Sequence, residues 1–203
     1  MKLKERQFFE QGYGALFGII SITIALIGIT ISYLTFPGYT IIKYTVSMLG
    51  VGPLGLGFNI GFIISGVLAI PYYLNLSYHF QTEEMPEQII TASILASMIS
   101  CVSYIFVGIF PQNFNVLFLY AGHIIFAFIT FTTGALYLIL FGYLMYQSNS
   151  FSKVQGIYSF LLCISYFTFI FTQIPLFEWV ALFGLVGWLT INSIYLFSLK
   201  HTR

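Results

Sequence analysis

The sequence has very few formally charged residues. Its 203 residues include seven Lys and Arg and six Glu, with no Asp, so charged residues make up 6% of the chain, against roughly 25% in a soluble domain. A chain that is 59% hydrophobic cannot form a water-compatible surface. Seven scattered cations also cannot build the basic face that nucleic-acid binding needs. These shortages exclude a soluble enzyme, a disordered chain and a nucleic-acid-binding protein, and they predict an integral membrane protein.

Several kinds of chemical motif are absent. The few carboxylates lie at a terminus, in a loop or at the end of an apolar run, whereas proton relays, intramembrane proteases and retinal proteins need ionisable groups in the middle of the bilayer. Gly-rich phosphate-binding loops are also missing. Cys101 and Cys163 fall inside apolar runs without a CxxC or Cys/His spacing, which favours packing over a metal or redox role. We expect no cofactor and no metal site.

Long stretches without a formal charge set the number of membrane crossings. A helix crosses the ~30 Å hydrocarbon core in about 20 residues, so the uncharged stretch from 88 to 152 must hold two helices, with the turn at Pro111-Gln112-Asn113. The alternation in blocks of about ten residues that is typical of barrel strands is absent. The sequence therefore predicts an all-α bundle of six transmembrane helices, over residues 13–36, 57–80, 88–110, 115–146, 155–174 and 178–199.

The positions of the cations predict the orientation. With six spans, Lys43 lies on one side of the membrane, and the other six cations lie on the opposite side: Lys2, Lys4, Arg6, Lys153, Lys200 and Arg203. Because cations are concentrated in cytoplasmic segments, both termini are expected to be cytoplasmic, in a multi-pass protein of the cell membrane. The first apolar run ends without the small-residue pattern of a cleavage site, which favours an uncleaved first helix.

The remaining polar residues gather toward the predicted outer side, and the inner halves of the predicted spans have few polar residues. The Gly-rich segment 47–57 is too apolar for a free loop, so we expect it to fold onto the outer helix ends or into the membrane interface. His123 lies roughly 13 Å into the fourth span, and we expect it to share a pocket with this segment and Asn59. The predicted ligand-binding site in the outer half consists of eight residues: Ser47, Gly50, Asn59, Gln112, Asn113, His123, Gln173 and Glu178.

Each of these assignments has a structural alternative. His123 either serves an outer cavity or is a structural histidine hydrogen-bonded to a neighbouring carbonyl or hydroxyl, and a single histidine makes no metal site. Asn59 would equally join two helices, and the pattern Gly61-x-x-x-Ser65 favours close helix packing. His79, at the end of the second span, is expected to be an interfacial anchor.

Four short motifs occur in order along the chain: Ser47-x-Leu49-Gly50-x-Gly52-Pro53, then Phe58-Asn59 with Gly66, then Val107-Gly108-Ile109-Phe110-Pro111, then His123. Their order and spacing resemble the prokaryotic membrane proteins grouped as domain of unknown function 998, over roughly residues 15–200. An Asp often follows the Ser in that family, where this chain has Met48. The layout also looks like the Frag, DRAM and Sfk group, which is implicated in lipid handling, lipid-anchor remodelling and autophagy. The resemblance implies a six-helix bundle with a shared outer site and supplies no reaction.

Three functions remain open, besides a structural role in a larger complex. We favour the binding of a lipid or small amphiphile in a cavity open to the outer leaflet, with membrane lipids as partners. The alternative is a small-molecule facilitator or transporter subunit, which needs a polar path through the inner half as well. A further alternative is a lipid-modifying enzyme with His123 as general base, which needs a carboxylate such as Glu178 to orient the imidazole.

Overall fold

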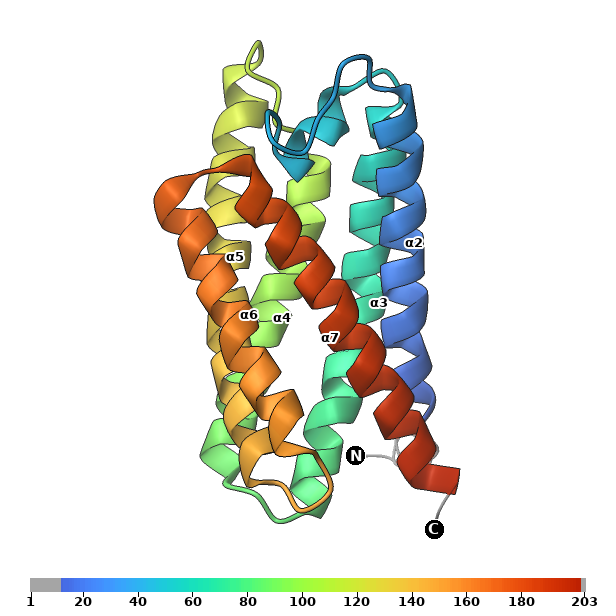
Figure 1. Cartoon of the computed structure of the whole chain (residues 1–203), viewed down its shortest axis with the longest axis vertical. Helices are drawn as coiled ribbons and strands as arrows, with labels where there is room; N and C mark the ends of the chain where they lie inside the picture. The colour runs from blue at the N-terminus through green and yellow to red at the C-terminus, as the bar shows by residue number, and fades with distance from the viewer. Residues whose placement is uncertain (1–11, 202–203) are drawn as a thin grey trace.

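The computed structural model describes residues 12–201, and in this range the chain is helical, with no strand. Six long helices and one short 3-10 helix follow one another, with the labels of Figure 1: α2 Tyr13–Thr35, η1 Val46–Val51, α3 Gly55–Thr82, α4 Glu87–Ile109, α5 Leu117–Gln147, α6 Lys153–Thr172 and α7 Pro175–His201. All six long helices are long and apolar enough to span a membrane. The predicted all-α fold with six membrane-spanning helices is therefore confirmed, and each helix begins and ends within about one turn of its predicted range.

The outward faces of the helices carry bare hydrophobic side chains. Leu34, Leu117 and Phe171 are 76%, 79% and 82% exposed. Such exposure of apolar side chains is unfavourable in water but not in the hydrocarbon core of a membrane. The multi-pass membrane character follows from these faces and from the helix lengths. The cations Lys2, Lys4, Arg6 and Arg203, and the side chain of Lys200, lie outside the described residues, so the cytoplasmic placement of the termini stays a prediction.

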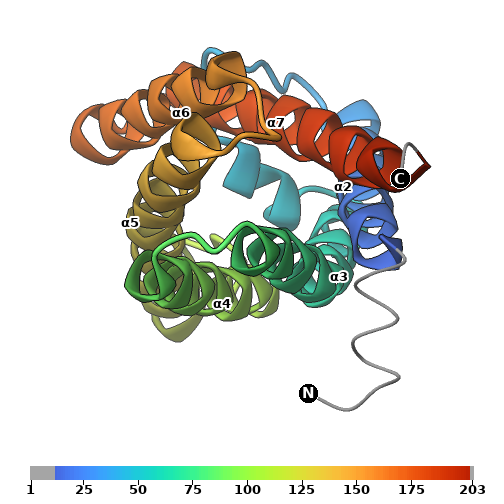
Figure 2. The ribbon, with the colours of Figure 1, turned by 90° about the horizontal axis from the view of Figure 1, so that it is seen from below.

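The six helices form a closed ring. Each one packs against its neighbour in the chain, and α7 returns to pack against α2. Figure 2 shows this ring along its axis, with η1 inside it, and Figure 1 shows that η1 lies at one end while α2 begins and α7 ends at the other. We call these the η1 end and the opposite end.

The tightest helix pair, α2 and α3, is held together by small residues. A Cβ at Gly28 would lie 2.5 Å from the carbonyl oxygen of Gly57, and a Cβ at Gly61 would lie 3.4 Å from the Cα of Gly28. One turn further along α3, the hydroxyls of Ser65 and Ser21 are 2.8 Å apart. Gly61-x-x-x-Ser65 thus packs closely against α2, as its small-residue spacing predicts.

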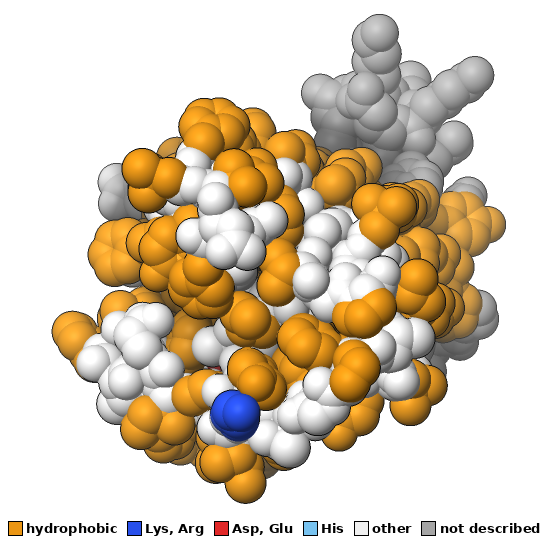
Figure 3. Space-filling model, turned by 90° about the horizontal axis from the view of Figure 1, so that it is seen from above, with side chains coloured by type: hydrophobic (Ala, Val, Ile, Leu, Met, Phe, Trp, Pro, Cys, Tyr) orange, Lys and Arg blue, Asp and Glu red, His pale blue; other side chains and the backbone are white. Residues whose placement is uncertain are grey.

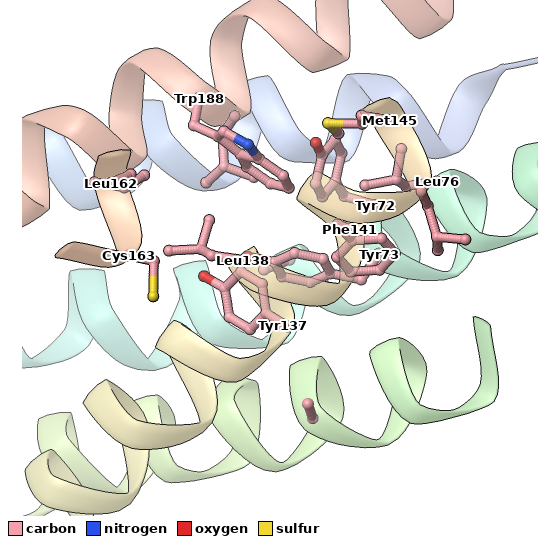
Figure 4. Close-up of a cluster of buried hydrophobic side chains, with 14 of the residues drawn as sticks. Tyr72, Tyr73, Leu76, Tyr137, Leu138, Phe141, Met145, Leu162, Cys163 and Trp188 are labelled. Carbon is pink, nitrogen blue, oxygen red and sulfur yellow. The ribbon is translucent and has the colours of Figure 1, made fainter. Parts of the chain in front are cut away.

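Two groups of buried side chains fill the ring. One lies at the η1 end and includes Leu49, Phe58 and Trp179. The larger one fills the half toward the opposite end and is rich in aromatic rings: Tyr72, Tyr73, Tyr137, Phe141 and Trp188. Figure 4 shows these rings packed together between α3, α5 and α7. The bundle is therefore closed by aromatic packing in one half and by η1 in the other.

The opposite end is tied together by polar contacts between two connections. The Glu83 carboxylate accepts a hydrogen bond of 2.7 Å from the Ser148 hydroxyl and lies 2.9 Å from His79 Nε2. Burial alone would raise the pKa of Glu83, but hydrogen bonds from Ser150 and Ser148 and the facing His79 together lower it. The carboxylate thus stays charged and links the loop after α3 to the loop after α5.

Candidate ligand-binding cavity

The short helix η1 lies inside the end of the ring because its side chains are apolar. Val46 and Leu49 are fully buried, so this segment folds onto the helices as its composition predicts. Turn backbone in such a place must find hydrogen-bond partners. Glu178, on the first turn of α7, supplies two of them: its carboxylate accepts the Val46 N–H at 2.7 Å and the Ser47 hydroxyl at 2.9 Å.

The other side of the η1 segment is attached to α2 and α3. The Asn59 amide donates to the Gly50 carbonyl at 3.0 Å. The Ser32 hydroxyl donates to the Leu54 carbonyl and accepts the Phe58 N–H, at 2.9 and 3.1 Å. These bonds satisfy free backbone groups at the start of α3. The segment is thereby fixed between α7 on one side and the α2–α3 pair on the other.

A cavity of about 110 Å³ lies beneath η1. All six helices contribute to its wall, which is mainly apolar and aromatic, and Val46, Ser47 and Glu178 line it at the η1 end. One water needs roughly 10–15 Å³ of such space, and an engineered cavity of about 150 Å³ holds benzene. The volume is therefore suited to a ring-sized or short-chain apolar group.

Hydroxyl groups are distributed around the wall of the cavity. Ser21, Ser65, Ser100 and Thr130 all line it, and their hydroxyls are engaged locally: Ser21 donates to the Ser65 carbonyl at 2.9 Å and Ser100 to the Thr130 carbonyl at 3.3 Å. None of the described lining residues is Lys, Arg or His. Glu178 is thus the one lining residue in the described chain that can carry a full charge at neutral pH.

The cavity ends against the aromatic group of the opposite half. Tyr73 and Tyr137 line it, and their ring centroids lie 5.0 Å apart. Behind them, the Phe141 ring stacks on Tyr73 and lies 6.4 Å from Trp188. Figure 4 shows this layer of rings. A solute in the cavity would have to displace the layer to reach the opposite end.

His123 does not lie in this cavity. It is buried, with 3% of its surface exposed, and its Nδ1 is 2.8 Å from the carbonyl oxygen of Phe110, at the end of α4. Because a carbonyl can only accept, Nδ1 carries the proton. Asn59 contacts α4 from the other side, where its carbonyl oxygen would lie 2.6 Å from a Cβ at Gly108. His123 on α5 and Asn59 on α3 thus both contact α4, which lies between these two helices in the ring, and neither residue lines the cavity.

The remaining predicted residues serve the connections between helices. Gln112 accepts a hydrogen bond of 2.9 Å from Thr45, which ties the α4–α5 loop to the segment before η1. The Asn113 side chain accepts the Asn115 N–H at 3.0 Å. Gln173 ends α6 in a left-handed conformation, and its amide donates back to the Ile170 carbonyl at 2.9 Å. Of the eight predicted residues, only Ser47 and Glu178 line the cavity, and Gly50 and Asn59 pair with each other beside it.

Sequence reasoning overlooked two features of the site. It included Glu178 among the eight predicted residues but did not predict the pairing of Glu178 with Val46 and Ser47, which anchors η1. It also named no tyrosine as a site residue, whereas Tyr73, Tyr104 and Tyr137 line the cavity. The available signal was their position in the middle of predicted spans, away from the interface where tyrosine is usual.

Toward the opposite end, which the predicted orientation makes the inner half, the bundle holds more buried polar side chains than the sequence led us to expect. In the half toward the opposite end, the Gln155 amide donates to Asn192 at 2.9 Å, and Asn192 donates to the Trp188 carbonyl at 2.9 Å. The Trp188 indole in turn donates to the Ser159 hydroxyl at 2.6 Å. These groups satisfy one another, as buried polar groups must. They join α6 to α7, and none of the four is among the residues that line the cavity.

Comparison with known protein families matches residues 19–198 to the family described as Protein of unknown function (DUF998). Neither the curated proteins nor the solved structures contain a match to the chain. The match covers all six membrane-spanning helices except the first turns of α2 and the last residues of α7.

Proposed function

The chain belongs to the DUF998 family of proteins of unknown function, and we propose that this member binds a small amphiphile in the cavity beneath η1. The observation that carries the proposal is the combination of an apolar cavity of about 110 Å³ with a buried carboxylate and hydroxyl, Glu178 and Ser47, at one end. Ligand pockets typically join an apolar wall to a few placed polar groups. The apolar part of the ligand would occupy the wall, and its polar end would face Glu178.

The size of the cavity limits the part of the ligand that it holds. A ring or a short alkyl segment fits a space of this order, so a two-chain lipid would insert only one end. Entry past η1 would require the Glu178 and Asn59 hydrogen bonds to the η1 segment to open. We propose that this entrance faces the outer leaflet of the cell membrane, with both termini cytoplasmic.

The two alternatives have less support. A facilitator needs a path past the rings of Tyr73, Phe141 and Trp188, which pack against one another. A lipid-modifying enzyme using His123 needs an orienting carboxylate, and in the described chain the hydrogen bond of His123 goes to the Phe110 carbonyl. Binding requires neither feature.

The proposal is tested with benzyl alcohol, a probe of the size that the cavity admits. Ala127 lines the cavity on α5, and Ala127→Leu would occupy part of it. Ala121 is exposed on the same helix, so Ala121→Leu is a matched control. At ten times its dissociation constant, a bound ligand stabilises a protein by about 1.4 kcal/mol, which raises the unfolding midpoint of a chain of this size by about 3–6 °C.

We expect benzyl alcohol to raise the midpoint of the detergent-solubilised protein and of Ala121→Leu, and to leave that of Ala127→Leu unchanged. The unliganded Ala127→Leu protein should itself gain about 0.5–2 kcal/mol of stability because the substitution fills a cavity. An equal response of all three proteins would mean that the probe acts outside the cavity, and no response in any of them would overturn the proposal.

A further inference from the structure

The charges around the cavity are unbalanced. Glu178 is 6% exposed, and its hydrogen bonds come from neutral donors: the Val46 N–H, the Ser47 hydroxyl and the Ser47 N–H. Within residues 12–199, the ion pair of the fold is His79–Glu83 at the opposite end. The cation of the η1 end, Lys43, has its ammonium 5.0 Å over the ring of Tyr44. Figure 3 shows the η1 end from above, where hydrophobic and uncharged polar atoms dominate.

The carboxylate of Glu178 retains capacity for a further hydrogen bond. A carboxylate offers about four lone-pair sites, and the η1 segment uses three of them, through the Val46 N–H, the Ser47 hydroxyl and the Ser47 N–H. The Ser47 hydroxyl, which also lines the cavity, retains acceptor capacity as well. A buried carboxylate without a cation is unfavourable, and a cation placed beside it relieves this cost. The rings of Phe62 and Tyr104, which stack at 4.3 Å in the same wall, are further surfaces that attract cations.

Resting on the proposed function, we infer that the amphiphile bound in this cavity carries a primary ammonium, which Glu178 and Ser47 hold, and that carboxylate or phosphate ends are rejected. An ammonium has three donors for the free acceptor sites. An anionic end would face Glu178 with no cation among the described lining residues to offset the repulsion. The same ammonium is present in free hydrophobic amines and in the headgroup of phosphatidylethanolamine.

Glu178→Gln separates charge from packing. The glutamine is nearly isosteric, and its carbonyl can accept the Val46 N–H while its amide donates to the Ser47 oxygen, so η1 keeps its attachment. Glu83→Gln is the matched control because Glu83 is also partly buried and hydrogen-bonded, but lies at the opposite end.

The experiment compares three probes with the same ring, benzylamine, benzyl alcohol and phenylacetate, by thermal shift of the detergent-solubilised protein at neutral pH. A charged hydrogen bond supports a preference of at least about tenfold, so we expect the wild-type protein and Glu83→Gln to bind benzylamine at least about tenfold more tightly than benzyl alcohol. In Glu178→Gln the ratio should fall to about one. Phenylacetate should bind the wild-type protein more weakly than benzyl alcohol, a result that needs no variant.

The outcomes separate the inference from the proposed function. The ammonium inference is overturned if benzyl alcohol binds in the cavity as tightly as benzylamine, or if the preference for benzylamine persists in Glu178→Gln. Either result leaves the proposed cavity function intact. Absence of binding by all three probes overturns both. Nanodiscs of phosphatidylcholine with and without phosphatidylethanolamine then identify the source. If phosphatidylethanolamine stabilises the wild-type protein but not Glu178→Gln, the ammonium belongs to the lipid headgroup. If phosphatidylethanolamine does not stabilise the protein although benzylamine binds, the ammonium belongs to a free amine.

Discussion

Replacing Gly28 with alanine tests the contact between α2 and α3 that supports the η1 end. The new Cβ would lie 2.5 Å from the backbone carbonyl oxygen of Gly57, where ordinary contacts begin at 3.4 Å. Because the neighbour is backbone, no side-chain rotation relieves the overlap and the helices must separate. Overpacking costs about 1–3 kcal/mol, and the higher helix propensity of alanine returns about 1 kcal/mol. We expect Gly28→Ala to lower the free energy of unfolding by about 1 kcal/mol, and by at most about 2 kcal/mol.

Gly57→Ala is the control on the facing helix. Its Cβ would meet Ile31 Cγ2 at 3.6 Å, an ordinary contact, so its stability should equal the wild type or rise by up to about 1 kcal/mol. Thermal unfolding in detergent, followed by intrinsic fluorescence, should place the midpoint of Gly28→Ala about 2–8 °C below that of Gly57→Ala. Equal midpoints for the two variants would refute the close approach of α2 and α3 at Gly28.

Two further predictions concern topology and pH. Cations are concentrated on the cytoplasmic side of a membrane, so both termini should be cytoplasmic. In a cysteine-free background, single cysteines replacing Lys2 or Lys200 should therefore resist an impermeant thiol reagent in intact cells, whereas a cysteine at the exposed Thr40 should react. Labelling at either terminus contradicts this orientation. The lowered pKa of Glu83 means that its contribution to stability is complete above its ordinary pKa and is lost as the pH falls through the lowered value. Unfolding midpoints measured between about pH 6 and 3 should therefore fall less steeply for Glu83→Gln than for the exposed-site control Glu84→Gln, and equal slopes would exclude the Ser148 and His79 contacts as the cause.

Helix positions could be predicted from the sequence because the bilayer leaves few choices. The thickness of the hydrocarbon core sets the length of each span, and uncharged runs separated by Lys43, Glu83 to Glu87 and Lys153 mark the connections. The burial of η1 could also be predicted, since Val46 and Leu49 have no other place to avoid water. Both conclusions depend on the hydrophobicity of the residues and on their depth in the membrane, and both can be read from a single sequence.

The composition of the site could be predicted only in part, because it depends on the rotation of each helix within the ring. The sequence places His123 and Asn59 in the same outer half, but they lie on α5 and α3, and α4 stands between these two helices in the ring. Glu178 meets Ser47 across 131 positions of sequence, and that contact depends on the path of α7 over the end of the bundle. The Gln155–Asn192 pair was overlooked for a related reason: amides inside an apolar run do not stop a helix from spanning, so hydropathy alone does not reveal them.

A crystal structure of the protein soaked with benzyl alcohol shows whether the cavity beneath η1 accepts a ligand. We expect electron density for one ring enclosed by the bundle, beside Phe62 and Leu182, with the hydroxyl directed toward Glu178 and Ser47. The Ala127→Leu protein, soaked in the same way, should lack this density. A wild-type structure in which side chains fill the space beneath η1, or in which the ring binds only on the lipid-facing surface, would contradict the account.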